Sequence, residues 1–309
     1  HHIYHEVAAA RYLNRNPSLL VSNATESISD HGNAADVYPI TKNPEHQLLT
    51  DLGVFTAACG ITSYTGGLFP PPYDSVTFVA EPVGNLVHAD ILRDRGATVT
   101  ARRLFEKKEF LASTDAWFRP ANMYVGPDGA LYVVDYYRQI IEHPEWMADD
   151  VAKSGAIYNG IDQGRIYRIV PENASKADWT SGLRLGDETT ENLVQHLASP
   201  NNWWRMNAQR LLIDRNDKTV VPLLEKMVVA SENPLGRLHA LWTLHGMSSL
   251  KADILLSGLR DSEAGVRENA IRIAEDMFLV KPAPDGNRIV DALIRLKNDP
   301  SPKVRYQLL

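Results

Sequence analysis

The chain has 309 residues, of which 44% are hydrophobic and 23% are charged, and its formal net charge is -6. This composition is typical of a globular protein and excludes a disordered or collagen-like chain. The acidic balance predicts no nucleic-acid partner, and no stretch approaches the roughly 18 consecutive apolar residues of a membrane span.

The length predicts two domains. The sequence begins His-His-Ile-Tyr-His, without an initiator Met or a signal-peptide pattern, so we expect an internal piece of a longer protein. Residues 2–13 have the pattern of a short helix. Residues 14–75 are rich in Ser, Asn, Gly and Pro and predict long loops.

Between residues 76 and 170, short β-branched and aromatic runs alternate with turn residues. The predicted strands are Val76–Ala80, Asn85–Ile91, Thr98–Arg103, Asn122–Val125, Leu131–Asp135 and Arg165–Ile169. The clearest hairpin turns at Pro127-Asp128-Gly129, where Pro presets φ and Gly accepts a positive φ. Repeated hairpins of this kind indicate a sandwich or a propeller.

A polar linker is predicted over residues 172–186, and from residue 187 the hydrophobic period becomes helical. Four segments repeat an arginine after a turn, and in three of them an alanine follows three residues later. These residues are Arg205, Arg237, Arg267 and Arg305, with Ala208, Ala240 and Ala270. Turns at residues 199–200, 233–234, 261–262 and 299–300 precede the second helix of each pair. The pattern predicts a right-handed α-solenoid of HEAT or armadillo type over residues 187–309.

Several motifs in the first half resemble the family of PVC-type haem-binding, membrane-bound dehydrogenases. They are His1–Val7, Ala58–Ile61, Glu81–Pro82, Asn85–His88, Glu109–Asp115, Trp117–Pro120, Gly126–Asp135, Ile141–Pro144 and Gly164–Arg168. The resemblance implies a β-propeller like that of glucose and sorbosone quinoprotein dehydrogenases, followed by HEAT repeats and a c-type cytochrome domain. Residues 1–171 would then be the C-terminal part of the propeller, two to three blades. The haem would lie only in a domain beyond this sequence.

The same resemblance implies a cofactor and a compartment. Pyrroloquinoline quinone (PQQ) is held in relatives by two arginines before the Pro-Asp-Gly turn and by a lysine. Here Arg119 matches the first arginine, but Ala121 stands at the second position and residues 81–88 contain no lysine. Relatives often have Cys before the Glu-Pro step, where this chain has Ala80. The family also implies a periplasmic or extracellular location, with membrane association of the full-length protein.

One group of side chains flanks the predicted hairpin and forms the first candidate site. We expect His143 and Asp135 to supply a base and its orienting carboxylate, and Arg119, Arg138 and Glu142 to bind an anionic ligand. The alternative is that Arg138 and Glu142 only brace a loop.

Glu81 and Asn85 are further candidates for ligand binding. On one strand they would share a face while His88 pointed away, so we expect no metal site there. Terminal histidines His1, His2 and His5 are not expected to form a metal site.

Two functions remain open. The first is oxidation of a small carbohydrate or alcohol, with electron transfer to the cytochrome domain beyond this sequence. The second is a non-catalytic module that binds carbohydrate, or binds a protein on its HEAT surface, at the cell envelope. Whether the chain is an enzyme, and with which cofactor, is not decided by the sequence.

Overall fold

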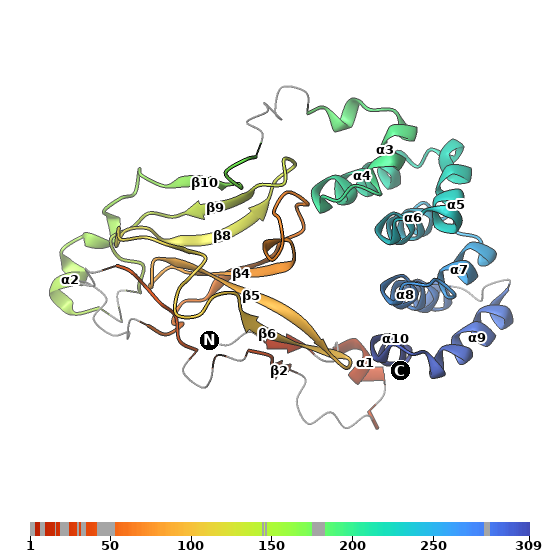
Figure 1. The fold of residues 1–309 in the computed structure, drawn as a ribbon, viewed down its shortest axis with the longest axis horizontal. Helices are drawn as coiled ribbons and strands as arrows, with labels where there is room; N and C mark the ends of the chain where they lie inside the picture. The colour runs from red at the N-terminus through yellow and green to blue at the C-terminus, as the bar shows by residue number, and fades with distance from the viewer. Residues whose placement is uncertain are drawn as a thin grey trace. The chain divides into compact units, whose positions relative to one another are not determined.

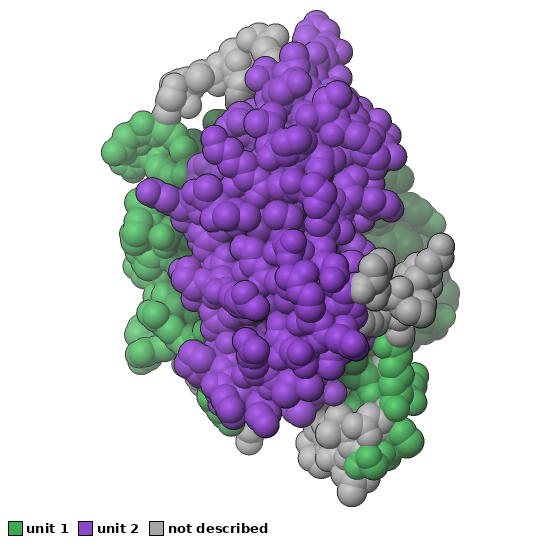
Figure 2. Space-filling model, turned by 90° about the vertical axis from the view of Figure 1, so that its right-hand side faces the viewer, with its two compact units in different colours: residues 1–174 green, residues 175–309 purple. Residues whose placement is uncertain are grey.

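The computed structural model of the protein describes residues 4–6, 10–15, 17–18, 25–29, 31, 35–41, 53–143, 145, 147–174, 183–280 and 285–309. The chain divides into two compact units, His1–Ala174 and Ser175–Leu309, which are green and purple in Figure 2. The boundary lies within the stretch 172–186 that the sequence predicts as a linker. The described strands lie in the first unit and the longer helices in the second, so the β + α class is confirmed.

The first unit contains two larger antiparallel sheets that do not close into a barrel (Figure 1). One has the order β3-β4-β5-β6, with β7 beside β5, and the other has the order β10-β9-β8. The bounds are β3 Cys59–Ser63, β4 Val76–Glu81, β5 Leu86–Arg95, β6 Thr98–Arg103, β7 Leu111–Ala112, β8 Pro120–Val125, β9 Leu131–Asp135 and β10 Arg165–Ile169. A short helix, α2, spans Asp149–Lys153.

The six strands predicted between residues 76 and 170 are all present, with small changes at their ends. The β8–β9 hairpin turns as expected. Gly129 has a φ of 78°, and the Asp128 carboxylate accepts a hydrogen bond from the Ala130 N–H at 3.2 Å. This left-handed conformation favours glycine because a Cβ atom would clash. In fact a Cβ on Gly129 would lie 2.8 Å from the Gly66 carbonyl oxygen.

Two expectations for the N-terminal region are wrong. In place of a helix over residues 2–13, the structure has strand β1 (Tyr4–Glu6) and helix α1 (Ala10–Arg15). Strand β1 pairs with β2 (Thr25–Ser27), a non-local partner that local periodicity does not reveal. The predicted loop region 14–75 also contains β3, which pairs with β4 and completes the edge of the larger sheet.

The two larger sheets share one hydrophobic core. Phe78 of β4, Met123 of β8 and Leu131 of β9 are almost fully buried in it. The Tyr64 hydroxyl joins this core to the hairpin, because it donates to the Gly129 carbonyl at 2.7 Å and accepts from two backbone N–H groups. Tight packing of this kind fixes the hairpin against the larger sheet.

Cys59 lies directly opposite Ala80 in the β3–β4 pair. Ala80 is the position at which the family resemblance places a second cysteine. Burial, together with the negative charge of Glu81, raises the pKa of the Cys59 thiol to about 11. Cys59 is therefore a free, protonated thiol at neutral pH.

The second unit is a series of helices that run back and forth (Figure 1). The bounds are α3 Thr190–His196, α4 Asn202–Arg215, α5 Val221–Ala230, α6 Pro234–Gly246, α7 Ala252–Gly258, α8 Ala264–Val280, α9 Gly286–Arg295 and α10 Pro302–Leu308. Ala208, Ala240 and Ala270 are fully buried, as the repeat predicts. Two helices begin later than expected, because Asn201 and Ser301 provide the caps rather than the residues before Pro200 and Pro300.

The repeated arginines act as local braces. In each of the four, Nη1 donates to the two carbonyl groups six and five residues earlier, which closes the turn before the helix. Arg237 and Arg267 also form bidentate ion pairs with Asp261 and Asp299 of the following turn. Among the residues that the structure describes, no helix combines the length and apolar character needed to cross a membrane.

Candidate functional site

The structure brings Arg119, Asp135 and Arg138 together, but as a brace for the backbone. The guanidinium of Arg119 is almost completely buried and donates to the carbonyls of Arg138, Pro82 and Gln139 at 2.9, 2.9 and 2.7 Å. Burial lowers the pKa of Arg119 to about 10, although the nearby carboxylates of Asp115 and Asp135 act against this. Its donors therefore point at the main chain.

Asp135 and Arg138 are used in the same way. One oxygen of Asp135 accepts from the Arg119 and Tyr137 N–H groups at 2.8 and 2.9 Å. Arg138 donates to the carbonyls of Tyr136, Tyr137 and Gly160. The expected anion-binding role is thus not supported, because a ligand would have to replace bonds that hold the exit of the hairpin.

His143 and Glu142 do not join this group. Both are exposed, and the printed contact between them is a hydrogen bond from the His143 main-chain N–H to Glu142 Oε1 at 3.0 Å. No ion pair between Arg138 and Glu142 occurs within the described part of the chain. A base at His143 oriented by Asp135 is therefore not what the structure presents.

Glu81 and Asn85 do not share a strand. Strand β4 ends at Glu81, and Asn85 lies in the following turn with a φ of 55°. Glu81 accepts hydrogen bonds from the N–H groups of Thr56, Ala57 and Val83, while burial raises its pKa. The Asn85 side chain donates to the carbonyls of Ala116 and Phe118. Both residues fix loops around the sheet edge.

These contacts also test the fit of PQQ to the chain. A tricarboxylate quinone needs several cations, yet the one matching arginine, Arg119, is buried and directed at backbone carbonyls. The second arginine position is Ala121, and residues 81–88 contain no lysine. The residues present do not fit the cofactor.

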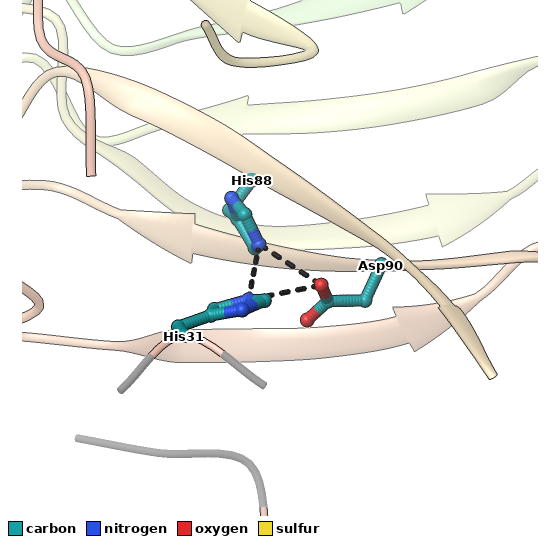
Figure 3. A group of neighbouring side chains, drawn as sticks. All are labelled: His31, His88 and Asp90. Carbon is teal, nitrogen blue, oxygen red and sulfur yellow. Dashed lines mark hydrogen bonds and ion pairs between the residues drawn. The ribbon is translucent and has the colours of Figure 1, made fainter. Parts of the chain in front are cut away.

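A different cluster unites three side chains that could hold a metal ion: His31, His88 and Asp90 (Figure 3). His31 Nε2 lies 2.9 Å from His88 Nε2 and 3.0 Å from Asp90 Oδ1. His88 Nε2 lies 3.1 Å from Asp90 Oδ1. The side chains of His31 and Asp90 are 2% and 0% exposed, so the cluster is shielded from water.

Strand periodicity and one backbone bridge position the three residues. His88 and Asp90 are two residues apart on β5, so their side chains lie on the same face of the sheet. The segment before His31 is held against β6, because Ser29 forms a bridge with Ala101 and the Ala101 N–H donates to the Ile28 carbonyl at 2.7 Å. This places His31 over β5 from a segment distant in sequence.

Glu109 extends the cluster. Its Oε2 atom lies 2.6 Å from His88 Nδ1, and its Oε1 atom accepts from the Tyr38 N–H at 2.9 Å. Burial alone would lower the pKa of His88, but the bonds and charges of Asp90 and Glu109 raise it to about 8. Burial alone would raise the pKa of Asp90, but hydrogen bonds from His31 and His88 lower it to about 2. Without any ion, the cluster is a network of charged hydrogen bonds.

A pocket adjoins the cluster at Glu109. Its volume is about 630 Å³, and its lining includes Tyr38, Lys107, Lys108 and Glu109. Glu109 thus contacts His88 on one side and lines the pocket on the other.

Sequence reasoning considered His88 but did not identify His31, Asp90 or Glu109. The alternation His88-Ala89-Asp90 on a predicted strand was a usable signal, since it places two potential ligands on one face. His31 and Glu109 carried no such signal, because they lie 57 and 21 residues from His88.

Comparison with known proteins adds one match. No curated protein and no solved structure matches the chain. The family model described as a domain of unknown function, DUF7133, matches residues 1–173. This match covers more than half of the chain, so the protein belongs to the DUF7133 family.

Proposed function

We propose that the first unit is the C-terminal part of a β-propeller and that the second is a HEAT-type solenoid. The antiparallel order β4-β5-β6 and β8-β9-β10, each joined by hairpins or longer returns, supports blades of a propeller. The four arginines that bind the carbonyls six and five residues earlier support a true structural repeat.

In function, the chain is a non-catalytic binding and scaffolding module for carbohydrate or protein at the cell envelope. One observation carries this proposal: Arg119, the cation that should meet a quinone, is buried and donates to three main-chain carbonyls. Asp135 is likewise occupied by backbone N–H groups, and His143 is apart from both. The residues of the expected catalytic pocket therefore support the fold.

The helical unit offers a surface for a protein partner. A pocket of about 530 Å³ is lined by residues of α5, α7 and α9 and their turns, among them Val229, Arg260 and Arg288. Val229 is 62% exposed, and apolar side chains beside arginines are common in protein interfaces. This surface is the place where we expect partner binding.

The second candidate function is oxidation of a sugar or alcohol, with a periplasmic or extracellular location. The observation in its favour is the family resemblance around the β8–β9 hairpin, Gly126–Asp135. In that case a cytochrome domain beyond this sequence would receive the electrons.

The two candidates differ in a direct assay. The purified chain is incubated with PQQ, a panel of sugars and alcohols, and an electron-accepting dye. The binding module predicts no substrate-dependent dye reduction and no PQQ binding by fluorescence titration. A glycan array and chemical crosslinking with envelope proteins then search for the ligand. Dye reduction that requires PQQ and is lost in Arg119→Lys would overturn the proposal in favour of the dehydrogenase.

A further inference from the structure

The cluster on β5 has the composition and geometry of a metal centre. We propose that His31 Nε2, His88 Nε2 and Asp90 Oδ1 bind one divalent first-row transition-metal ion. Two imidazoles and one carboxylate are a ligand set that such ions prefer. The inference is independent of the function proposed above, because it concerns residues that neither candidate function uses.

Hydrogen bonds alone do not satisfy the three atoms. They form three contacts of 2.9 to 3.1 Å, the edges of a nearly equilateral triangle. The Asp90 carboxylate brings no hydrogen atom, and each histidine brings at most one at Nε2. At most two hydrogens therefore serve three contacts, and one contact joins two electronegative atoms without a hydrogen between them. A single cation above the triangle would interact favourably with all three.

The edge lengths also indicate the coordination geometry. At a metal–ligand distance of about 2.1 Å, edges near 3.0 Å correspond to ligand–metal–ligand angles of about 90°. Such angles belong to one face of an octahedron. A tetrahedral site would need edges of about 3.4 Å at the same bond length. The arrangement therefore fits a six-coordinate ion such as Mn²⁺, Fe²⁺ or Co²⁺, with three further positions for water or an exogenous ligand.

Glu109 supplies the outer contact that metal-binding histidines usually have. Its carboxylate lies 2.6 Å from His88 Nδ1, so it accepts the Nδ1 hydrogen and leaves the Nε2 lone pair free for an ion. The Tyr38 N–H holds the other oxygen of Glu109 at 2.9 Å. The orientation of His88 is thus fixed independently of any ion.

The charge balance of the cluster points the same way. Asp90 is fully buried, and its Oδ2 atom has no hydrogen-bond partner among the described residues. Glu109 adds a second buried carboxylate, and the nearest arginine atom, Arg103 Nη1, is 3.8 Å from it. Phe55 packs edge-on against the His88 ring with centroids 5.4 Å apart. A divalent cation would offset the negative charge in this apolar surrounding, where an uncompensated carboxylate is costly.

Co²⁺ alone is the probe for this site, since its visible spectrum reports coordination number. The chain is treated with a chelator, desalted and titrated with Co²⁺ by calorimetry and absorption. His1, His2 and His5 are first replaced by Gln, which removes a competing cluster at the N-terminus. We expect one Co²⁺ per chain with the weak visible bands of six-coordinate cobalt.

Variants separate this site from adventitious binding. His31→Ala should weaken binding at least 100-fold, and Glu109→Gln should weaken it 10- to 100-fold. His143→Ala is the matched control, an exposed histidine of the same unit, and should bind like the parent. Circular dichroism and melting of the metal-free variants establish that they are folded. If His31→Ala does not fold, Glu109→Gln alone decides. Unchanged affinity in a folded His31→Ala or Glu109→Gln variant, no binding by the folded parent, or intense four-coordinate bands would overturn the proposal.

Discussion

Replacement of Arg119 by Met tests whether this arginine is a structural brace. The substitution keeps most of the side-chain volume but removes three hydrogen bonds to the carbonyls of Pro82, Arg138 and Gln139. Each buried carbonyl left without a donor costs about 1 to 3 kcal/mol. Relief of the buried charge offsets part of this, so we expect a net loss of about 3 kcal/mol in the free energy of unfolding of the first unit.

Hydrogen exchange measured by mass spectrometry is the appropriate assay, because the chain has two units and need not unfold in one step. Peptides spanning 119–139 should exchange faster in Arg119→Met, while peptides of helix α6 should be unchanged. Arg93→Met on the exposed end of β5 is the control and should change stability by less than about 0.5 kcal/mol. Equal exchange in Arg119→Met and the wild type would refute the brace and make the guanidinium available for a ligand.

Three further substitutions test other parts of the fold. Ala240→Glu should destabilise the helical unit by several kcal/mol, because it forces a charge into a fully buried helix contact; an unchanged melting curve at 222 nm would contradict the repeat register. His239 has a pKa lowered to about 4 by burial and by Arg205, so the folded state resists protonation while the unfolded chain, with an ordinary pKa near 6.5, takes up a proton. The stability of the helical unit should therefore fall between pH 6.5 and pH 4, and His239→Gln should make the urea midpoint flatter over this range. Ala80→Cys should form a disulfide with Cys59 under mild oxidation, because paired residues of antiparallel strands have Cα atoms about 4.5 to 5.5 Å apart; thiol counting and mass spectrometry detect it, and two persistent free thiols would contradict the β3–β4 register.

The helical unit could be predicted in detail from the sequence because its stabilising contacts are local and repeat. Each arginine binds carbonyls only five and six residues away, and each repeat buries a small alanine against a neighbouring helix. Such contacts leave a regular imprint on the sequence. The strands between residues 76 and 170 were predictable for a similar reason, since turn residues such as Asp128 and Gly129 mark where the chain reverses.

The sites were decided by tertiary structure. Arg119 was correctly placed beside Asp135, yet its role depends on the carbonyls of Pro82, Arg138 and Gln139, and carbonyl groups are identical in every residue. A sequence therefore shows that a cation is present but does not show what it donates to.

The His31 cluster illustrates the same limit over a longer distance. Alternation on β5 places His88 and Asp90 on one face, and this could be read from the sequence. His31 comes from a segment rich in polar and small residues, and it reaches the cluster only because Ser29 pairs with Ala101 on β6. Local residue patterns determine which segments become strands and helices, whereas the closure of loops between distant segments determines which side chains meet, and that closure depends on packing and pairing across the whole unit.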